Sequence, residues 1–309
     1  MVQKDLAGKT LEAIEEVFAD IVNCIMFDGR EVMKAGDLSD AEPRSQYKAD
    51  GEYHEQVRDV AKYWNKCGIR MAFVGIENET SKSKSKYMPL RIISYDGGAY
   101  RAQLPKQTKK DTDQLVQEES KALYPAVSMV LYFGTDNKWE KNTSLKEVLT
   151  IPPELEPYVN DYRIHVVNVA FLERVQIDKF KSDFWFVADY FWQLRNNKNY
   201  TPSDKNVKYA RQVLQMMSAM TGDNSFEKAY NDKKRESEKG GNKNMRAYIN
   251  EAVEERERQE REKSIRILVV SLSEAGAADD FIARKLVENY ELTPEQAKNK
   301  IEKCRPIPA

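Results

Sequence analysis

The fold is decided by two consecutive segments, Gln56-Val57-Arg58-Asp59-Val60-Ala61-Lys62-Tyr63-Trp64 and Ile69-Arg70-Met71-Ala72-Phe73-Val74-Gly75-Ile76-Glu77. Both segments are rich in β-branched and aromatic residues, which predicts strands over 56–64 and 69–77. The four residues between them, Asn65-Lys66-Cys67-Gly68, are typical of a hairpin turn. The two strands are therefore expected to pair in an antiparallel sheet.

Three acidic residues gather on this hairpin: Asp59 on the first strand, Glu77 on the second, and Glu79 two residues further on the same face. A turn centred on Gly68 places Asp59 opposite Glu77, whereas a turn centred between Lys66 and Cys67 leaves them three residues out of step. Clustered carboxylates repel one another unless a cation or protons intervene. The apolar flanks imply burial, and buried unpaired acids are costly, so we expect a metal site here.

Composition excludes several kinds of chemistry. The 309 residues include three cysteines, far apart, and two histidines, so neither a disulfide framework nor a Cys/His zinc site is expected. No phosphate-binding glycine motif is present, and neither histidine lies near a nucleophile elbow. If the chain is an enzyme, carboxylates must carry the chemistry, and carboxylates bind Mg²⁺ or Mn²⁺ through oxygen.

Charge is uneven along the chain. The net charge is −1, but residues 81–110 hold eight basic residues against the single acid Asp96. This stretch could meet phosphates, or it could be a solvated loop balanced by the acids that follow. No run of about 18 apolar residues and no hydrophobic leader is present, so we expect a soluble, cytoplasmic protein without membrane contact.

The remaining patterns predict an α/β domain with a mixed sheet. Helical periodicity covers 9–28, proline opens a helix over 89–104, and continuous apolar runs predict buried strands over 127–133 and 164–172. The domain is expected over 1–202, with its core at about 9–175.

The C-terminal third is predicted to be helical. Helices are expected over 183–195 and 205–220, and residues 203–243 make up a helix and a polar linker. A third region, 244–309, should hold a charged helix over 245–263 and a helical hairpin whose second helix opens with the capping box Thr293-Pro294-Glu295-Gln296. This hairpin could read DNA, dock a partner or form a homo-oligomer, or it could simply pack on its neighbours.

Several motifs together resemble the Rpn family of bacterial recombination-promoting nucleases and putative transposases, over roughly residues 5–202. They are Val17–Asn23, Pro43–Gly51, Arg58–Trp64, Met88–Arg91, Tyr95–Gly97, Tyr100–Arg101 and Pro157–Tyr162. The resemblance implies a PD-(D/E)xK nuclease-like mixed sheet core flanked by helices. It also implies Mg²⁺-dependent cleavage of DNA, with Mn²⁺ as a substitute, and a link to recombination or mobile DNA.

The resemblance assigns the motif aspartate to Asp59 and the second acid to Glu77, both as catalytic metal ligands. Glu79 stands where the superfamily has lysine and this family more usually glutamine, so it would serve as a ligand or a base. Asp20 and Asn23 would contact the metal ligands without binding the metal themselves. The groups expected to contact DNA are Lys82, Lys84, Lys86, Arg91, Tyr95 and Arg101.

The departure at Glu79 keeps alternatives open. Lys62 and Lys82 are nearby replacements for the missing lysine, although Lys62 should lie on the strand face opposite Asp59. The chain could instead be a weak or inactive nuclease fold that acts as a DNA-binding or protein-interaction module. A phosphodiesterase of small substrates is a third reading, which predicts a closed pocket.

Overall fold

The computed structural model describes residues 11–41, 44–49, 52–67, 69–104, 122–197, 200–227, 230, 244–290 and 292–304. The chain forms two compact units, Met1–Arg246 and Ala247–Ala309. Most of the polar linker expected up to residue 243 lies outside the described residues.

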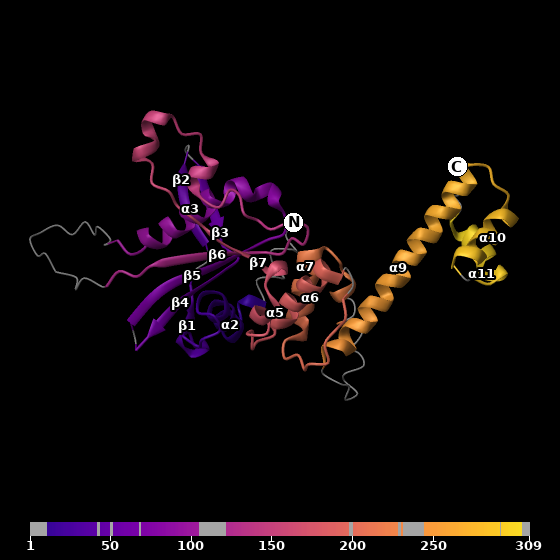
Figure 1. Cartoon of the computed structure of the whole chain (residues 1–309), viewed down its shortest axis with the longest axis horizontal. Coiled ribbons are helices and arrows are strands. Elements are labelled where there is room, and N and C mark those ends of the chain that lie inside the picture. The colour runs from indigo at the N-terminus through magenta and orange to yellow at the C-terminus, as the bar shows by residue number, and fades with distance from the viewer. Residues whose placement is uncertain are drawn as a thin grey trace, which may run out of the picture. The chain divides into compact units, whose positions relative to one another are not determined.

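A five-stranded mixed sheet forms the centre of the first unit (Figure 1). Its order is β1 (Leu38–Asp40), β4 (Val60–Lys66), β5 (Ile69–Glu79), β6 (Ala126–Tyr132) and β7 (His165–Asn168). The pairs β1–β4 and β4–β5 are antiparallel, while β5–β6 and β6–β7 are parallel. The predicted α/β class with a mixed sheet is confirmed.

The predicted strand over 56–64 is wrong in its extent, because the chain breaks pairing at Arg58 and Asp59. Before the break, β3 (Glu52–Val57) pairs only with β2 (Arg44–Ala49) in a separate hairpin, and β4 begins after it. In the β4–β5 ladder Val60 is paired with Ile76, and the same register continued by one residue sets Asp59 against Glu77. This is the register expected from a turn centred on Gly68, but the turn itself lies between the paired residues Lys66 and Ile69, and a β-bulge at Trp64 and Asn65 makes up the one-residue difference.

Helix α3 (Met88–Arg101) covers one face of the sheet. Proline at its first turn opens it close to the predicted position, and it ends three residues earlier than predicted. Its apolar side packs on alternate residues of β6; the buried cluster is Met88, Ile92, Tyr95, Val130, Tyr132, Trp139 and Ile164. Because side chains alternate along a strand, Glu77 and Glu79 also lie on the α3 face of β5, whereas Asn78 lies on the other.

Helices from before and after the sheet complete the first unit. They are α2 (Glu15–Met26), the short α4 (Leu145–Val148) and α5 (Arg174–Ile177), α6 (Phe184–Asn197) and α7 (Ala210–Thr221). The aromatic residues of α6 are core residues: Phe184, Trp185, Phe186, Tyr190 and Phe191 are all at most 7% exposed. Trp192 of the same helix is half-buried.

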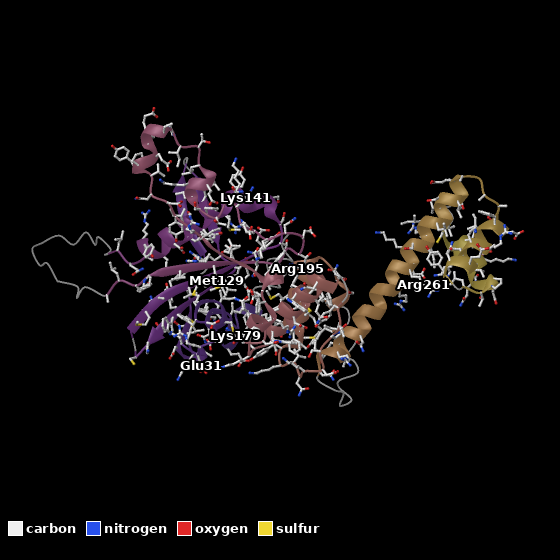
Figure 2. The ribbon with its side chains drawn as sticks, viewed as in Figure 1. Glu31, Met129, Lys141, Lys179, Arg195 and Arg261 are labelled. Atoms are coloured by element: carbon white, nitrogen blue, oxygen red, sulfur yellow. The ribbon has the colours of Figure 1, made fainter. Side chains whose placement is uncertain are left out.

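The β6 strand runs through the middle of this core. Met129 on β6 is fully buried and lies inside the unit in Figure 2. Just beyond the strand, Phe133 contacts Phe191 of α6 with ring centroids 5.1 Å apart. The predicted strand over 164–172 is shorter than expected, since β7 gives way to a 3-10 turn at Val169–Phe171.

Within its described residues, the second unit is helical, and its first helix begins two residues before the unit does. The helix α9 (Met245–Glu274) is continuous and longer than the predicted 245–263, and α10 (Asp279–Tyr290) and α11 (Pro294–Cys304) follow it. Their shared core consists of Ile265, Val269, Ile282, Leu286, Ala297 and Ile301. The predicted capping box is present, because Thr293 Oγ1 accepts the N–H of Gln296 while Gln296 Oε1 accepts that of Thr293. None of the described helices is long and apolar enough to cross a bilayer.

Candidate active site

Asp59 and Glu77 meet where β4 begins beside β5. The backbone N–H of Asp59 donates to Glu77 Oε1 at 3.3 Å, and Asp59 Oδ2 accepts the N–H of Asn78 at 2.8 Å. Glu77 is 1% exposed, whereas Asp59 is half-buried. The break between β3 and β4 leaves the Asp59 N–H and carboxylate directed at β5, so the two predicted acids are brought together.

Helix α3 supplies a cation to this pair. Arg91 Nη2 donates to Glu77 Oε2 at 2.9 Å and to the hydroxyl of Tyr95 at 3.3 Å. Arg91 and Tyr95 are four residues apart and therefore lie on one face of the helix. Both were expected to contact phosphate, and the structure places both beside the carboxylates.

A third acid, Glu12, approaches from the opposite face of the sheet. Its Oε2 accepts the side-chain N–H of Asn78 at 2.6 Å, and the carboxylate is fully buried. Glu12 Oε1 and Asn78 Oδ1 are both buried without a hydrogen-bond partner. Sequence reasoning missed Glu12, because the helical pattern of this segment marks only its apolar residues and gives no reason to bury an acid.

The three acids are electrostatically coupled. Burial, reinforced by the charge of Asp59, raises the pKa of Glu77 to about 8 although Arg91 opposes the shift. Burial also raises the pKa of Glu12 to about 8, with the charges of Asp59 and Glu77 adding to it and the bond from Asn78 opposing it. Below about pH 8 both glutamates therefore tend to keep a proton, and a divalent cation would bind by taking the place of these protons.

A buried polar network holds the break in place. Arg58, 3% exposed, donates through Nη2 to Asp96 Oδ1 at 2.6 Å and through Nη1 to the hydroxyl of Ser128. Tyr162 donates to the other oxygen of Asp96. A Cβ on Gly75 would overlap Arg58 Nη1, so the glycine on β5 is what leaves room for the guanidinium. Because Arg58 directly precedes Asp59, this network fixes the backbone that carries the predicted motif aspartate.

The remaining predicted site residues have other neighbours. Glu79 is 6% exposed, and its Oε1 accepts the backbone N–H groups of Thr80 and Ser81, both at 3.0 Å. Asp20 Oδ2 accepts the N–H groups of Lys181 and Ser182. Asn23 is hydrogen-bonded to the backbone of residues 32–33. These contacts stabilise turns and loops, and the structure does not bring Asp20 or Asn23 onto Asp59 or Glu77.

The basic residues are divided between the core and the surface. Lys62 is 1% exposed and pairs with Asp40 at 2.6 Å, so it does not replace the missing lysine. Lys86 and Arg101 are exposed. The side chains of Lys82 and Lys84, also expected to contact DNA, are outside the described part of the structure.

Metal binding by this site rests on a pair of acids. Within the described ranges, no three or more His, Cys, Asp or Glu side chains are grouped so that they could hold a metal ion. Mg²⁺, however, commonly uses only one or two protein carboxylates and keeps several waters. Asp59 and Glu77, with Glu12 within electrostatic reach, therefore fit a hard divalent cation, while a ligand set that includes Glu79 stays a prediction.

Among protein-family models, curated proteins and solved structures, none matches this chain.

Proposed function

We propose that the chain is a Mg²⁺-dependent endodeoxyribonuclease of the PD-(D/E)xK type, linked to recombination or mobile DNA. The observation that carries the proposal is the Asp59–Glu77 pair, formed across the β4–β5 register, partly buried and only partly neutralised by Arg91. The resemblance of the sequence motifs to the Rpn family supports the same reading. In this proposal the substrate is the DNA backbone and the cofactor is Mg²⁺, for which Mn²⁺ can substitute.

Asp59 and Glu77 would hold the cation. When bound, the cation supplies a water of lowered pKa and neutralises charge on the scissile phosphate. Asp59 is half-buried and accepts the Asn78 N–H, so one oxygen of its carboxylate is oriented by β5. Glu79 would act as a further ligand or as a base, at the same end of β5, although its Oε1 is already used by two backbone N–H groups.

Basic groups around the site would hold the DNA backbone. Arg91 and Tyr95 lie beside the acids on α3, and Lys86, just before this helix, and Arg101, at its end, are exposed. Such contacts give affinity and register without reading base sequence. DNA binding should therefore weaken as salt rises, by counterion release.

The test is cleavage of supercoiled plasmid by the purified full chain in Mg²⁺ or Mn²⁺. Asp59→Asn and Glu77→Gln keep the side-chain volumes and remove the ligand charges, and Glu31→Gln, an exposed glutamate at the surface in Figure 2, is the matched control. Removing a carboxylate that holds the metal should cost several kcal/mol of transition-state stabilisation, and the cleavage rate should fall by at least about 100-fold. Equal rates in wild type and both site variants would overturn the proposal.

A second candidate is a weak or inactive nuclease fold that acts as a DNA-binding or protein-interaction module, including self-association through the helices of the second unit. The observation that favours it is Glu79, which stands in the motif-lysine position and is tied to the backbone of Thr80 and Ser81. Salt-dependent DNA binding without cleavage would support this candidate. Glu79→Lys then tests whether a lysine restores cleavage. The substitution also removes the oxygen that accepts the backbone N–H groups of Thr80 and Ser81.

A further inference from the structure

Two arginines contact acids near the break between β3 and β4, and they are held very differently. Arg58 uses two nitrogens, on Asp96 and Ser128, and the side chains of the Arg58–Asp96 pair are 4% and 2% exposed. The two hydrogen bonds described for Arg91 both use the single nitrogen Nη2, its Cζ lies 5.8 Å from the centroid of the Tyr95 ring, and its side chain is 40% exposed. Arg58 therefore forms a fixed internal pair, while Arg91 is held by one end at the surface of the unit.

Arg91 holds one of the two Glu77 oxygens that a cation could use. Glu77 Oε1 accepts the N–H of Asp59 and Oε2 accepts Arg91, so each oxygen of the buried carboxylate has one described donor. A metal ligated by Glu77 thus competes with the guanidinium. At the same separation, a divalent ion attracts the two carboxylates about twice as strongly as the guanidinium does, while it must give up more of its hydration to bind them.

We propose that Arg91 is an exchangeable counter-ion of the Asp59–Glu77 pair, displaced from Glu77 by a divalent cation and then turned toward a phosphate oxygen of the DNA. The inference rests on the proposed function for the identity of the phosphate, but its first half concerns only Arg91 and the cation. The displaced guanidinium stays on α3, where its planar array of donors suits phosphate oxygens. The positive charge would thus become available to DNA only when the metal site is filled.

The hydrogen bond from Arg91 to Tyr95 offers a second way to test the exchange of Arg91 for a cation. Tyr95 is 7% exposed and lies in the α3 core cluster, so its hydroxyl is a fixed acceptor for Arg91. Removal of this hydroxyl should loosen Arg91 without changing the charge of the site. A neutral hydrogen bond contributes about 0.5–1.5 kcal/mol, which corresponds to about 2- to 10-fold in an equilibrium.

The experiment is Mn²⁺ binding to the full chain, measured by electron paramagnetic resonance of the free ion. Arg91→Gln removes the competing charge and should bind Mn²⁺ at least about tenfold more tightly than wild type. Tyr95→Phe keeps the ring and the fold, and it should bind Mn²⁺ about 2- to 10-fold more tightly. Arg70→Gln is the control, because it removes an exposed arginine from β5 at a position roughly 23 Å from Glu77 along the strand, and should change affinity by less than about twofold.

A second readout follows DNA binding in Ca²⁺ and in EDTA. Wild type should gain more DNA affinity from Ca²⁺ than Arg91→Gln does, since only wild type releases a guanidinium. Mn²⁺ affinity that is unchanged or weaker in both Arg91→Gln and Tyr95→Phe, or undetectable in every variant, overturns the inference. Tighter Mn²⁺ binding in these variants, combined with a wild type that cuts no plasmid, would refute the nuclease while supporting the exchange.

Discussion

Replacing Glu12 by glutamine should stabilise the first unit, and the gain should grow as pH rises. The carboxylate is fully buried, one of its oxygens has no hydrogen-bond partner, and burial raises its pKa from 4.5 to about 8. The folded protein therefore keeps a proton that the unfolded chain loses above about pH 4.5. Stability consequently falls as pH rises from about 4.5 to about 8 and levels off above that range.

The size of the effect follows from the two pKa values. Each tenfold difference in proton affinity is worth about 1.4 kcal/mol, so the full displacement corresponds to on the order of 4–5 kcal/mol. Roughly 2–3 kcal/mol of this should develop between pH 5 and pH 7. Glutamine removes the charge, keeps an acceptor for Asn78, and offers a donor in a pair where Asn78 Oδ1 lacks one.

The assay is urea unfolding of wild type and Glu12→Gln in EDTA at pH 5, 7 and 9. Glu31→Gln is the control, because Glu31 is exposed, and its difference from wild type should stay constant with pH. Addition of Mg²⁺ at pH 9, where Glu12 is ionised in the folded protein, should stabilise wild type more than Glu12→Gln, since a bound cation offsets the repulsion among the three acids. A difference between Glu12→Gln and wild type that does not change from pH 5 to pH 9 would refute the reasoning.

Three further substitutions test the packing inside each of the two units. Gly75→Ala should destabilise the first unit by about 2–4 kcal/mol in chemical denaturation, because the added methyl overlaps Arg58 and disturbs a buried ion pair. Gly97→Ala on α3 is its matched control, since nothing lies within 4 Å of the added atom, and it should stabilise the protein by about 0.5–1 kcal/mol. Ile282→Ala should cost the second unit about 2–5 kcal/mol and leave the melting transition of the first unit unchanged; equal effects on both transitions in calorimetry would contradict two independent cores.

Local patterns were enough to predict the hairpin and the helix that covers it. β-Branched and aromatic residues on either side of a turn predicted paired strands at 56–64 and 69–77, and Pro89 predicted the start of α3. Of the two registers left open, the structure has the one that sets Asp59 against Glu77. These features depend on neighbouring residues, so they can be recognised in a single sequence.

The break at Arg58 could not be predicted in this way. Within 56–64 the pattern reads as one strand, and the reason for the break lies far away, in Asp96 of α3 and Ser128 of β6. A buried arginine needs partners that satisfy its charge, and only the folded chain shows which residues do so. Gly75, which leaves room for the Arg58 guanidinium, is a feature of the sequence that is related to the break.

The sequence by itself predicted the mixed sheet and the hairpin that carries Asp59 and Glu77, since composition and local patterns depend on residues close together in the chain. Only the tertiary structure decided that Glu12 joins the acids, that Arg91 neutralises Glu77, and that Glu79 is tied to the end of its own strand. Whether an ionisable side chain meets a charge, an N–H group or solvent depends on segments remote in sequence. That dependence is why a predicted pair of acids became a coupled site only in the folded protein.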